Sequence, residues 1–335
     1  MAQFRSLTDS DVREILTLFG VARDAYAGHA AIAAGTVNTN VRVETAAGPR
    51  FLRINEGKTA DDVAREAAIV AFVAARGVPT PAPALTARGE PFATWRGQFV
   101  SLFPWSQGRT LDREEMTPAH ARQAGAALGL LHRAGADASD RRPGRYEPDE
   151  IERRLARIET VAGTDPALAT AVAALRPELG SLARERQPEL PVGLIHGDLF
   201  IDNVLYDEGT LVSLLDFEQA SWGRWAYDVA VTLLAFAFGR DDFRPDVVRA
   251  VLAGYVAERP PTDAERAGLA AELRFAACRF SVTRITDVYL KRGAGAAPGK
   301  DFRRYLLRLQ RVREHLDAGD GLLTFPREKD PQRVL

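Results

Sequence analysis

A segment in the second half of the chain constrains its fold more than any other. An apolar run over 192–195 leads into a loop with Asp198 and Asn203, and a second apolar run over 211–215 leads into Asp216. Short apolar runs bounded by loop residues are typical of buried strands. We therefore expect two adjacent strands that present these three oxygen-bearing side chains at the same end of a sheet.

The chemistry of the three side chains indicates phosphoryl transfer from ATP. That reaction uses one carboxylate to accept the proton of an attacking hydroxyl, and a carboxamide and a second carboxylate to hold Mg2+ on the phosphates. Asp198 would be the catalytic base. Asn203 and Asp216 would bind the metal, because Mg2+ prefers oxygen ligands. The alternative is that all three residues are turn formers or helix caps, positions that Asp and Asn also favour.

The spacing of the segment adds a signature to this chemistry. The order His-x-Asp-x4-Asn over 196–203, followed by Asp-Phe at 216–217, parallels the catalytic-loop and metal-aspartate motifs of protein kinases. The pattern therefore predicts a kinase that uses ATP and Mg2+.

Three short segments go beyond this signature. They read HGDLFIDNVLY at 196–206, LLDFE at 214–218 and AYDVA at 226–230, and a later helical segment from Arg274 reads RFAACRFSVTRITDVYL. Through these segments the chain resembles the aminoglycoside phosphotransferase-like superfamily of small-molecule kinases. Within that superfamily it resembles the type II homoserine kinases. The resemblance spans most of the chain.

The resemblance implies a fold, a reaction and two supporting residues. The implied fold is a kinase-like bilobal α+β fold, with a small antiparallel β-sheet lobe over residues 1–103 for nucleotide binding and a larger, mainly helical lobe over 104–335 for catalysis and substrate binding. The implied reaction is transfer of the γ-phosphate of ATP to the side-chain hydroxyl of L-homoserine, a step of threonine biosynthesis. His196 would hold the catalytic loop by packing and hydrogen bonding. Asp228 would be a buried hydrogen-bond acceptor that steadies the same loop.

Composition argues against several other classes of protein. The formal net charge is −1 and Lys and Arg form no basic run, so electrostatics give no support for a nucleic-acid partner. Cys278 is the single cysteine, which excludes an internal disulfide and suits a reducing compartment. The first residues lack a signal-peptide pattern, and the apolar runs are too short to span a bilayer. We therefore expect a cytoplasmic protein with a small-molecule hydroxyl substrate and no nucleic-acid or membrane partner.

Local patterns predict where the regular elements lie. Helix-capping and periodicity signals predict helices that begin near Thr8, Asp61, Thr117, Thr262 and Asp301. Alternation and turn signals predict strands at 41–44, 51–54 and 98–103. Strand signals are confined mainly to the first hundred residues, which favours two lobes of different composition.

The first lobe supplies candidates for the nucleotide site, namely Gly35, Asn38, Asn40, Arg53, Glu66 and Phe103. The loop over 35–40 lies between two strand-like runs, where a kinase covers the phosphates with backbone N–H groups. With a single glycine, an ordinary hairpin is the alternative. Arg53 stands where a kinase usually has a phosphate-binding Lys, and its guanidinium could bind the same group. Glu66, on the following helix, is expected to form an ion pair with Arg53.

Four residues are candidates for binding the acceptor. Asp202 and Glu218 flank the catalytic positions and could receive a substrate ammonium group, or they could be exposed loop acids. If the acceptor is an amino acid, its carboxylate should meet an arginine, whose planar fork matches it bidentately. Arg279 and Arg284 are the candidates. Because they are five residues apart on a helix, at most one should be a direct ligand.

Other functions within and outside this superfamily stay open. The acceptor could be an aminoglycoside, choline or another amino alcohol, or a protein serine or threonine. A site for a cationic aminoglycoside or choline should be markedly acidic, whereas Arg279 and Arg284 favour an anionic or zwitterionic acceptor such as an amino acid. A catalytically silent nucleotide-binding protein is a further alternative. Arg53 and the glycine-poor loop leave room for it, whereas the retained base and metal ligands argue against it.

Overall fold

The computed structural model describes residues 6–32, 38–186, 189–292 and 298–326. Within these residues the chain forms two compact units. The first comprises the residues up to 109 together with 212–218, and the second comprises 110–211 and the residues from 219 onward. The assignment of nucleotide binding to residues 1–103 and of catalysis and substrate binding to 104–335 stays a prediction.

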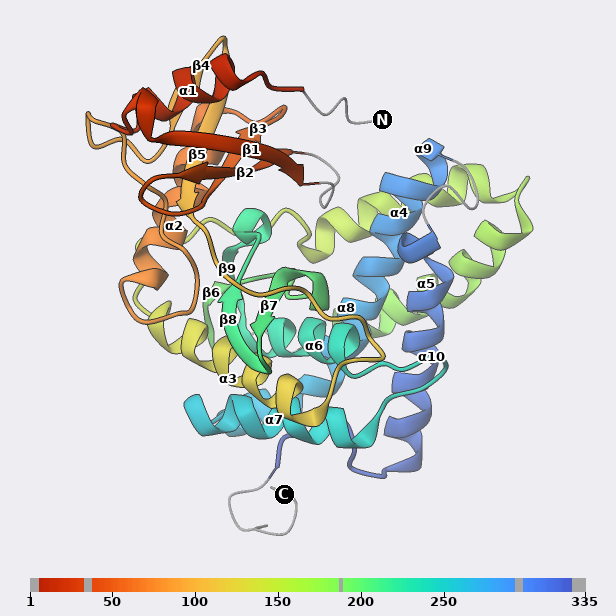
Figure 1. Ribbon diagram of the computed structural model, residues 1–335. Coiled ribbons are helices and arrows are strands. Elements are labelled where there is room, and N and C mark those ends of the chain that lie inside the picture. The colour runs from red at the N-terminus through yellow and green to blue at the C-terminus, as the bar shows by residue number, and fades with distance from the viewer. Residues whose placement is uncertain (1–5, 33–37, 187–188, 293–297, 327–335) are drawn as a thin grey trace. The chain divides into compact units, whose positions relative to one another are not determined.

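A five-stranded antiparallel sheet forms the centre of the first unit (Figure 1). In sheet order its strands are β1 (Tyr26–Ile32), β2 (Thr39–Thr45), β3 (Arg50–Asn55), β5 (Gln98–Pro104) and β4 (Ala93–Trp95). Buried and half-buried residues alternate along β2, as they do when one face of a sheet packs on a core. The strands predicted at 41–44, 51–54 and 98–103 are therefore confirmed.

Two helices, α1 (Asp9–Leu18) and α2 (Ala60–Ala74), complete the first unit. Each begins with a capping box in which a threonine, Thr8 or Thr59, satisfies a backbone N–H of the first turn. The apolar face of α1 joins the sheet in one hydrophobic core. The helix starts predicted near Thr8 and Asp61 are thereby confirmed.

The second unit is mainly helical. Its longer helices are α3 (Pro118–Ala134), α4 (Pro148–Ala162), α5 (Pro166–Glu185), α6 (Trp225–Phe236), α7 (Pro245–Glu258), α8 (Asp263–Arg284) and α10 (Arg303–Ala318). A π-helical segment (Ile285–Tyr289) and the short α9 (Leu290–Arg292) follow α8. The helices predicted to begin near Thr117, Thr262 and Asp301 are confirmed as α3, α8 and α10.

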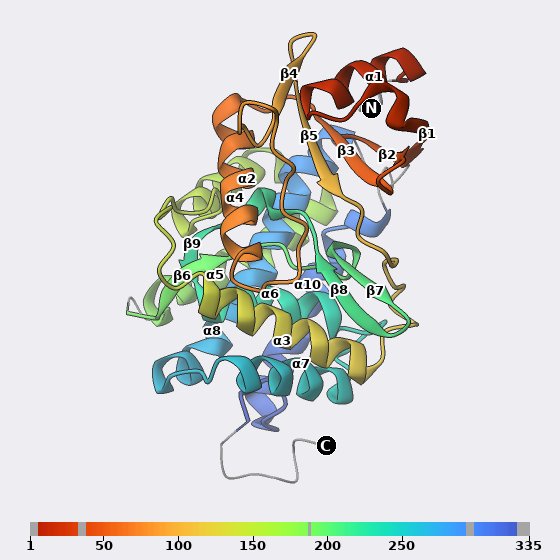
Figure 2. The same cartoon turned by 60° about the vertical axis from the view of Figure 1, so that its left-hand side comes forward.

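Helices α3 and α7 lie side by side, as Figures 1 and 2 both show. Glycines allow their backbones to approach closely. A methyl group on Gly125 of α3 would overlap the carbonyl oxygen of Val251, and one on Gly254 of α7 would overlap that of Arg122. This contact fixes α3, which carries a residue of the loop support described below.

Four short strands around the catalytic segment form two separate two-stranded sheets. The pairs are β6 (Val192–Ile195) with β9 (Ser221–Arg224), and β7 (Val204–Asp207) with β8 (Thr210–Leu214). The expectation that β6 and β8 are adjacent strands of one sheet is therefore wrong. The reason is local, because Glu208 and Gly209 both have positive φ, 46° and 82°, and such a turn closes β7 and β8 into a hairpin.

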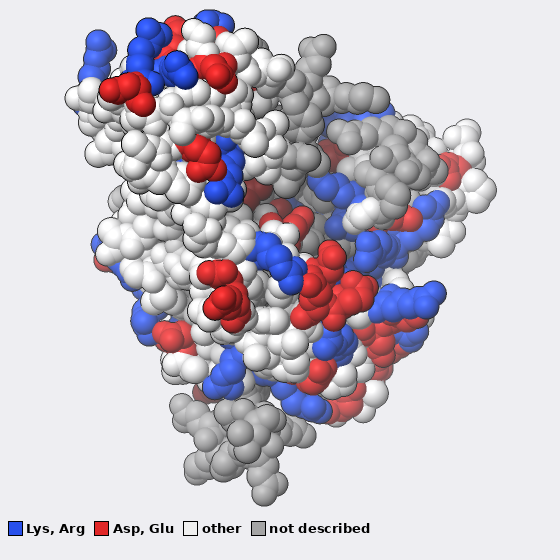
Figure 3. All heavy atoms as spheres, viewed as in Figure 1, with Lys and Arg blue, Asp and Glu red and all other residues white. Residues whose placement is uncertain are grey.

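The α+β class predicted from the sequence is confirmed by a sheet-based unit and a mainly helical unit. Acidic and basic side chains are interspersed on the face drawn in Figure 3, so that face carries no continuous basic stripe. Across the described ranges, no helix combines the length and the apolar character needed to cross a bilayer.

Candidate active site

A buried carboxylate holds the catalytic loop where it leaves β6. Asp228 of α6 is fully buried, and its two oxygens accept hydrogen bonds from the backbone N–H groups of His196 at 2.7 Å and Gly197 at 2.8 Å. Gly197 has a φ of 75°, and a side chain there would also press on the carbonyl oxygen of Gln219. Glycine is therefore required at this turn. Asp228 is thus the buried hydrogen-bond acceptor that was expected at this loop, whereas a supporting role of the His196 side chain stays a prediction.

His132 of α3 is a further partner of Asp228. Its Nε2 lies 3.0 Å from Asp228 Oδ2, and its Nδ1 lies 2.9 Å from the hydroxyl of Tyr255, with all three side chains buried. Burial lowers the pKa of His132, although Asp228 opposes this effect. Burial raises the pKa of Asp228, but the hydrogen bond from His132 and the loop N–H groups hold it below its ordinary value. Both pKa shifts are consistent with a neutral His132 imidazole whose Nε2–H donates to an ionised Asp228.

Asp198 directly follows the supported turn. Its side chain is 33% exposed, and Arg279 Nη1 lies 3.7 Å from its Oδ1. Burial raises the pKa of Asp198, and the positive charge of Arg279 opposes that rise. A carboxylate with a raised pKa is a better proton acceptor near neutral pH, and Arg279 helps to keep it ionised. The role of Asp198 as the catalytic base stays a prediction.

Asn203 is anchored to the same loop through its amide nitrogen. Its Nδ2 donates to the backbone carbonyl of Asp198 at 2.8 Å. Because the nitrogen is used in this bond, the carboxamide oxygen is the atom that can face a cation. The loop thus presents one hard oxygen ligand beside the base.

Asp216 belongs to the first unit, whereas Asp198 and Asn203 belong to the second. It follows β8 with a φ of 61°, a left-handed conformation that is uncommon for a residue other than glycine. Such conformations concentrate at functional sites. Joint metal binding by Asn203 and Asp216 stays a prediction.

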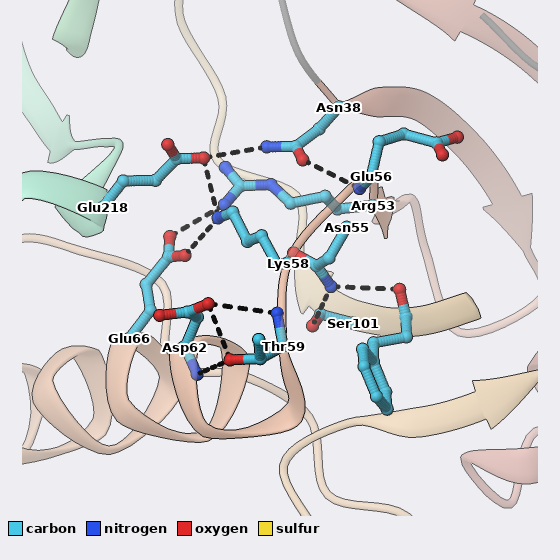
Figure 4. A network of polar contacts seen from close by, with 11 residues as sticks. Asn38, Arg53, Asn55, Glu56, Lys58, Thr59, Asp62, Glu66, Ser101 and Glu218 are labelled. Carbon is cyan, nitrogen blue, oxygen red and sulfur yellow. Dashed lines mark hydrogen bonds and ion pairs between the residues drawn. The ribbon is translucent and has the colours of Figure 1, made fainter. Parts of the chain in front are cut away.

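In the first unit, two cations share one glutamate (Figure 4). Arg53 Nη1 lies 2.8 Å from Glu66 Oε1, so the expected ion pair is present, and Lys58 Nζ lies 2.8 Å from Glu66 Oε2. Lys58 Nζ also lies 2.7 Å from Glu218 Oε1, which accepts a hydrogen bond from Asn38 Nδ2 at 3.0 Å. These ion-paired side chains are mostly buried, so salt screens them less than surface pairs.

The charges of this network shift the pKa values of Arg53 and Glu218. Burial lowers the pKa of Arg53, but the carboxylates of Glu66, Asp216 and Glu218 raise it above its ordinary value. Burial raises the pKa of Glu218, but Lys58 and Asn38 hold it below its ordinary value. Both groups are therefore charged at neutral pH.

Lys58 is the residue of this network that sequence reasoning missed. It lies just after β3 and before α2, outside the strand position where a kinase usually has its lysine. Its ammonium group nevertheless meets Glu66, the partner predicted for Arg53. The sequence signal for it was that Lys58 is the only lysine before position 291 in a chain whose positive charge is supplied mostly by arginine.

Three more residues had been assigned to the nucleotide site. Gly35 lies outside the described residues. Asn40 lies on β2 directly opposite Arg53 of β3. Phe103 of β5 packs beside Phe51, with 6.0 Å between ring centroids, and the Arg53 guanidinium lies 5.9 Å from its ring. Asn40 and Phe103 are thus neighbours of Arg53 in the sheet.

The structure distinguishes between the four residues that were candidates for binding the acceptor substrate. Glu218 is held by Lys58 and Asn38, so we withdraw it as a partner of a substrate ammonium group. Asp202 is an exposed loop acid. Arg284 donates to the backbone carbonyl of Asp301 at 3.2 Å and stacks over Tyr305, which is a structural role. Among the four, Arg279 alone is buried and placed beside Asp198.

The donor set suits a hard divalent cation held together with substrate phosphates. In the parts of the chain that the structure describes, no three His, Cys, Asp or Glu residues gather as a protein-only metal cage. Mg2+ usually keeps several waters and is bound by one or two protein oxygens plus phosphate. A carboxamide such as that of Asn203 and a carboxylate such as that of Asp216 are oxygen ligands of this kind, and their binding of one shared ion stays a prediction.

The first unit carries a buried cation paired with a glutamate, and the second carries a carboxylate on an anchored loop. Both features are typical of kinase-like phosphotransferases. The chain belongs to the phosphotransferase enzyme family, whose model matches residues 29–269. Over 330 residues it is 32% identical to a homoserine kinase of Nitrobacter winogradskyi, a match that covers 96% of this chain and 99% of that protein. A homoserine kinase of Agrobacterium fabrum is 31% identical over 320 residues, with 92% and 95% covered.

Solved structures show the same fold at low sequence identity. An amicoumacin kinase in complex with AMP-PNP and Ca2+ is 16% identical and superimposes with a TM-score of 0.67, covering 96% of each chain. A choline kinase from Cryptosporidium parvum is 12% identical, with a TM-score of 0.62 and coverage of 94% and 97%. The predicted kinase-like fold is therefore confirmed.

Proposed function

We propose that this phosphotransferase transfers the γ-phosphate of ATP to the side-chain hydroxyl of L-homoserine. The observation that carries this proposal is the similarity to homoserine kinases at about one-third identity over nearly the whole length of both chains. The product would be O-phosphohomoserine, an intermediate of threonine biosynthesis.

A coarser statement does not depend on the acceptor. The chain is a phosphotransferase that acts on an alcohol group of a small molecule, and it uses ATP with a divalent metal ion, of which Mg2+ is the usual one. Membership of the family together with retention of the base and the oxygen ligands disfavours the catalytically silent alternative.

Asp198 is the group that acts on the acceptor in this proposal. Its carboxylate accepts the hydroxyl proton and orients the oxygen toward the γ-phosphate. The hydrogen bonds from His196 and Gly197 to Asp228 fix the loop that carries it, so the oxygen is aimed before the acceptor arrives. The positive charge of Arg279 favours the ionised form of this carboxylate, against the effect of burial on its pKa.

The remaining residues act on the nucleotide. The Asn203 oxygen and the Asp216 carboxylate would hold the divalent ion, which neutralises phosphate charge when it is bound. Arg53 and Lys58, both oriented by Glu66, provide the positive charge of the first unit for phosphate oxygens. A kinase usually has a lysine at the strand position that Arg53 occupies here. In this proposal Lys58 supplies the ammonium group of that lysine.

The test is ADP release from ATP and Mg2+ with a panel of alcohols. The panel comprises L-homoserine, L-serine, L-threonine, choline, ethanolamine and an aminoglycoside. L-homoserine should give the highest kcat/KM, with the new phosphate ester identified by 31P NMR. A higher kcat/KM with any other alcohol would overturn the acceptor while leaving the reaction class in place.

A further inference from the structure

The second unit contains a cavity of about 200 Å3 beside the catalytic loop. Its lining includes Gly197, next to the base, and Arg279, whose guanidinium lies 3.7 Å from Asp198. Sites for drug-sized ligands usually measure about 300–1,000 Å3. The cavity is therefore of a size for a small metabolite rather than for an aminoglycoside.

The charged side chains of the cavity favour a ligand with a carboxylate. Arg186 and Arg224 line it and share one buried acid, Glu272, at 2.6 and 2.8 Å, so the three residues together carry a net positive charge. Arg279 adds a further positive charge. Among the described residues that line the cavity, Glu147 is the one acid.

Arg279 has unused hydrogen-bond donors. The residue is 4% exposed, and its guanidinium is stacked 4.1 Å from the ring centroid of Tyr146 and 3.8 Å from that of Phe280, which fixes its plane. Its contact with Asp198 at 3.7 Å is too long for a hydrogen bond. Its Nε is buried without a hydrogen-bond partner among the described residues. A ligand carboxylate that accepts from this guanidinium would give the Nε the partner that buried donors usually have.

We propose that this cavity binds the head group of a hydroxy α-amino acid, with its carboxylate on Arg279 and its ammonium group on Glu147. The acceptor would be held in the second unit by its two charged groups, and its hydroxyl would extend to the adjacent Asp198. The inference rests on the proposed function and names the residues that select its substrate. Alcohols that lack a carboxylate would be rejected because they leave the Arg279 fork unpaired.

Two analogues of L-homoserine isolate the two contacts. 3-Amino-1-propanol lacks the carboxylate and 4-hydroxybutanoate lacks the ammonium group, while both keep the primary hydroxyl. For the wild-type enzyme, kcat/KM should be at least about 10-fold higher for L-homoserine than for either analogue, because hydrogen bonds to charged groups are strong.

Substitutions then assign each preference to a residue. Arg279→Gln and Arg279→Lys should reduce the preference for L-homoserine over 3-amino-1-propanol by about 10-fold or more, and Glu147→Gln should reduce the preference over 4-hydroxybutanoate. Ratios are used because loss of Arg279 also alters Asp198, which affects every acceptor equally. Arg284→Gln on the same helix and Asp149→Asn beside Glu147 are matched controls and should leave both ratios unchanged. An unaltered KM for ATP confirms that each variant is folded.

The outcomes separate this inference from the proposed function. If the wild-type enzyme uses L-homoserine and the Arg279 variants keep the wild-type ratio, the cavity assignment is wrong and the proposed function stands. If Arg284→Gln changes the carboxylate preference instead, the assignment is equally wrong. If the wild-type enzyme does not use L-homoserine, the proposed function falls and this inference falls with it.

Discussion

At the scale of single residues, the properties of Asp198 come from its neighbours. Asp228 fixes the preceding turn, burial raises the pKa of the Asp198 carboxyl, and Arg279 opposes that rise. Replacing the carboxylate by a carboxamide of the same size keeps the shape but removes the proton acceptor.

Asp198→Asn should therefore lower kcat by about 10²–10⁴-fold, the usual contribution of a general base, with ATP binding retained. Single-turnover kinetics and calorimetric titration with ATP would measure the two effects. Asp202→Asn, a change at an exposed acid of the same loop, is the control and should retain most of the activity. Undiminished turnover by Asp198→Asn would remove that residue from the role of base.

Lys58 is the second residue whose neighbours suggest a role. Lys58→Met would remove an ammonium group that contacts both Glu66 and Glu218. We expect the KM for ATP to rise by about 10-fold or more, because charge-assisted hydrogen bonds contribute about 1.5–3 kcal/mol. Steady-state kinetics at varied ATP would show it. Arg42→Ala removes a half-exposed cation on β2 of the same unit and should have no such effect. An equal KM increase in both variants would contradict the assignment.

At the scale of elements, the contact between α3 and α7 depends on two glycines. Gly125→Ala would place a methyl group against the carbonyl oxygen of Val251 and force the helices apart. Overpacking of this kind costs about 1–3 kcal/mol, so the melting temperature should fall by several degrees. Differential scanning calorimetry would measure it.

Gly180→Ala is the same substitution at a helix position where the added methyl group has room. Gly180 lies within α5, and an added methyl group there meets nothing within 4 Å. Alanine favours the helix over glycine by about 0.5–1 kcal/mol, so this variant should be slightly more stable than the wild type. Equal effects of the two substitutions would show that the α3–α7 contact can relax.

At the scale of the whole molecule, the buried pair of His132 and Asp228 links folding stability to pH. The folded-state pKa of His132 lies below its unfolded value, mainly because of burial. As pH falls below about 6.5, the unfolded chain binds a proton that the folded chain does not, so stability falls. Asp228, whose folded-state pKa is also lowered, stabilises the fold above about pH 4 and loses that contribution in stronger acid.

His132 should therefore make the free energy of unfolding decrease from pH 7 to pH 5, by at most about 1.4 kcal/mol per pH unit. Burial lowers the pKa of His315, but Asp320 and Asp242 raise it above its ordinary value, so His315 contributes with the opposite sign. His132→Gln keeps an N–H donor for Asp228 but cannot titrate, so its slope over this range should be shallower. Urea titrations at several pH values would measure both slopes. Identical slopes in the wild type and His132→Gln would exclude His132 as the titrating group.

The sequence by itself determined features that depend on neighbours along the chain. Capping threonines and apolar periodicity located α1, α2, α3 and α8, because helix starts are fixed by contacts within one turn. The spacing of Asp198, Asn203 and Asp216 identified the chemistry, because that chemistry requires specific residue types in a fixed order.

Only the tertiary structure decided which distant residues meet. His132 and Asp228 lie 96 positions apart, and nothing in the local pattern of either residue indicates the other. The choice of Arg279 over Arg284 depends on which face of α8 is turned toward Asp198. The strand pairing was misjudged because two apolar runs carry no information on their partners, whereas the turn at Glu208 and Gly209 does. Long-range contacts reflect the packing of whole elements, which periodicity within a segment does not specify.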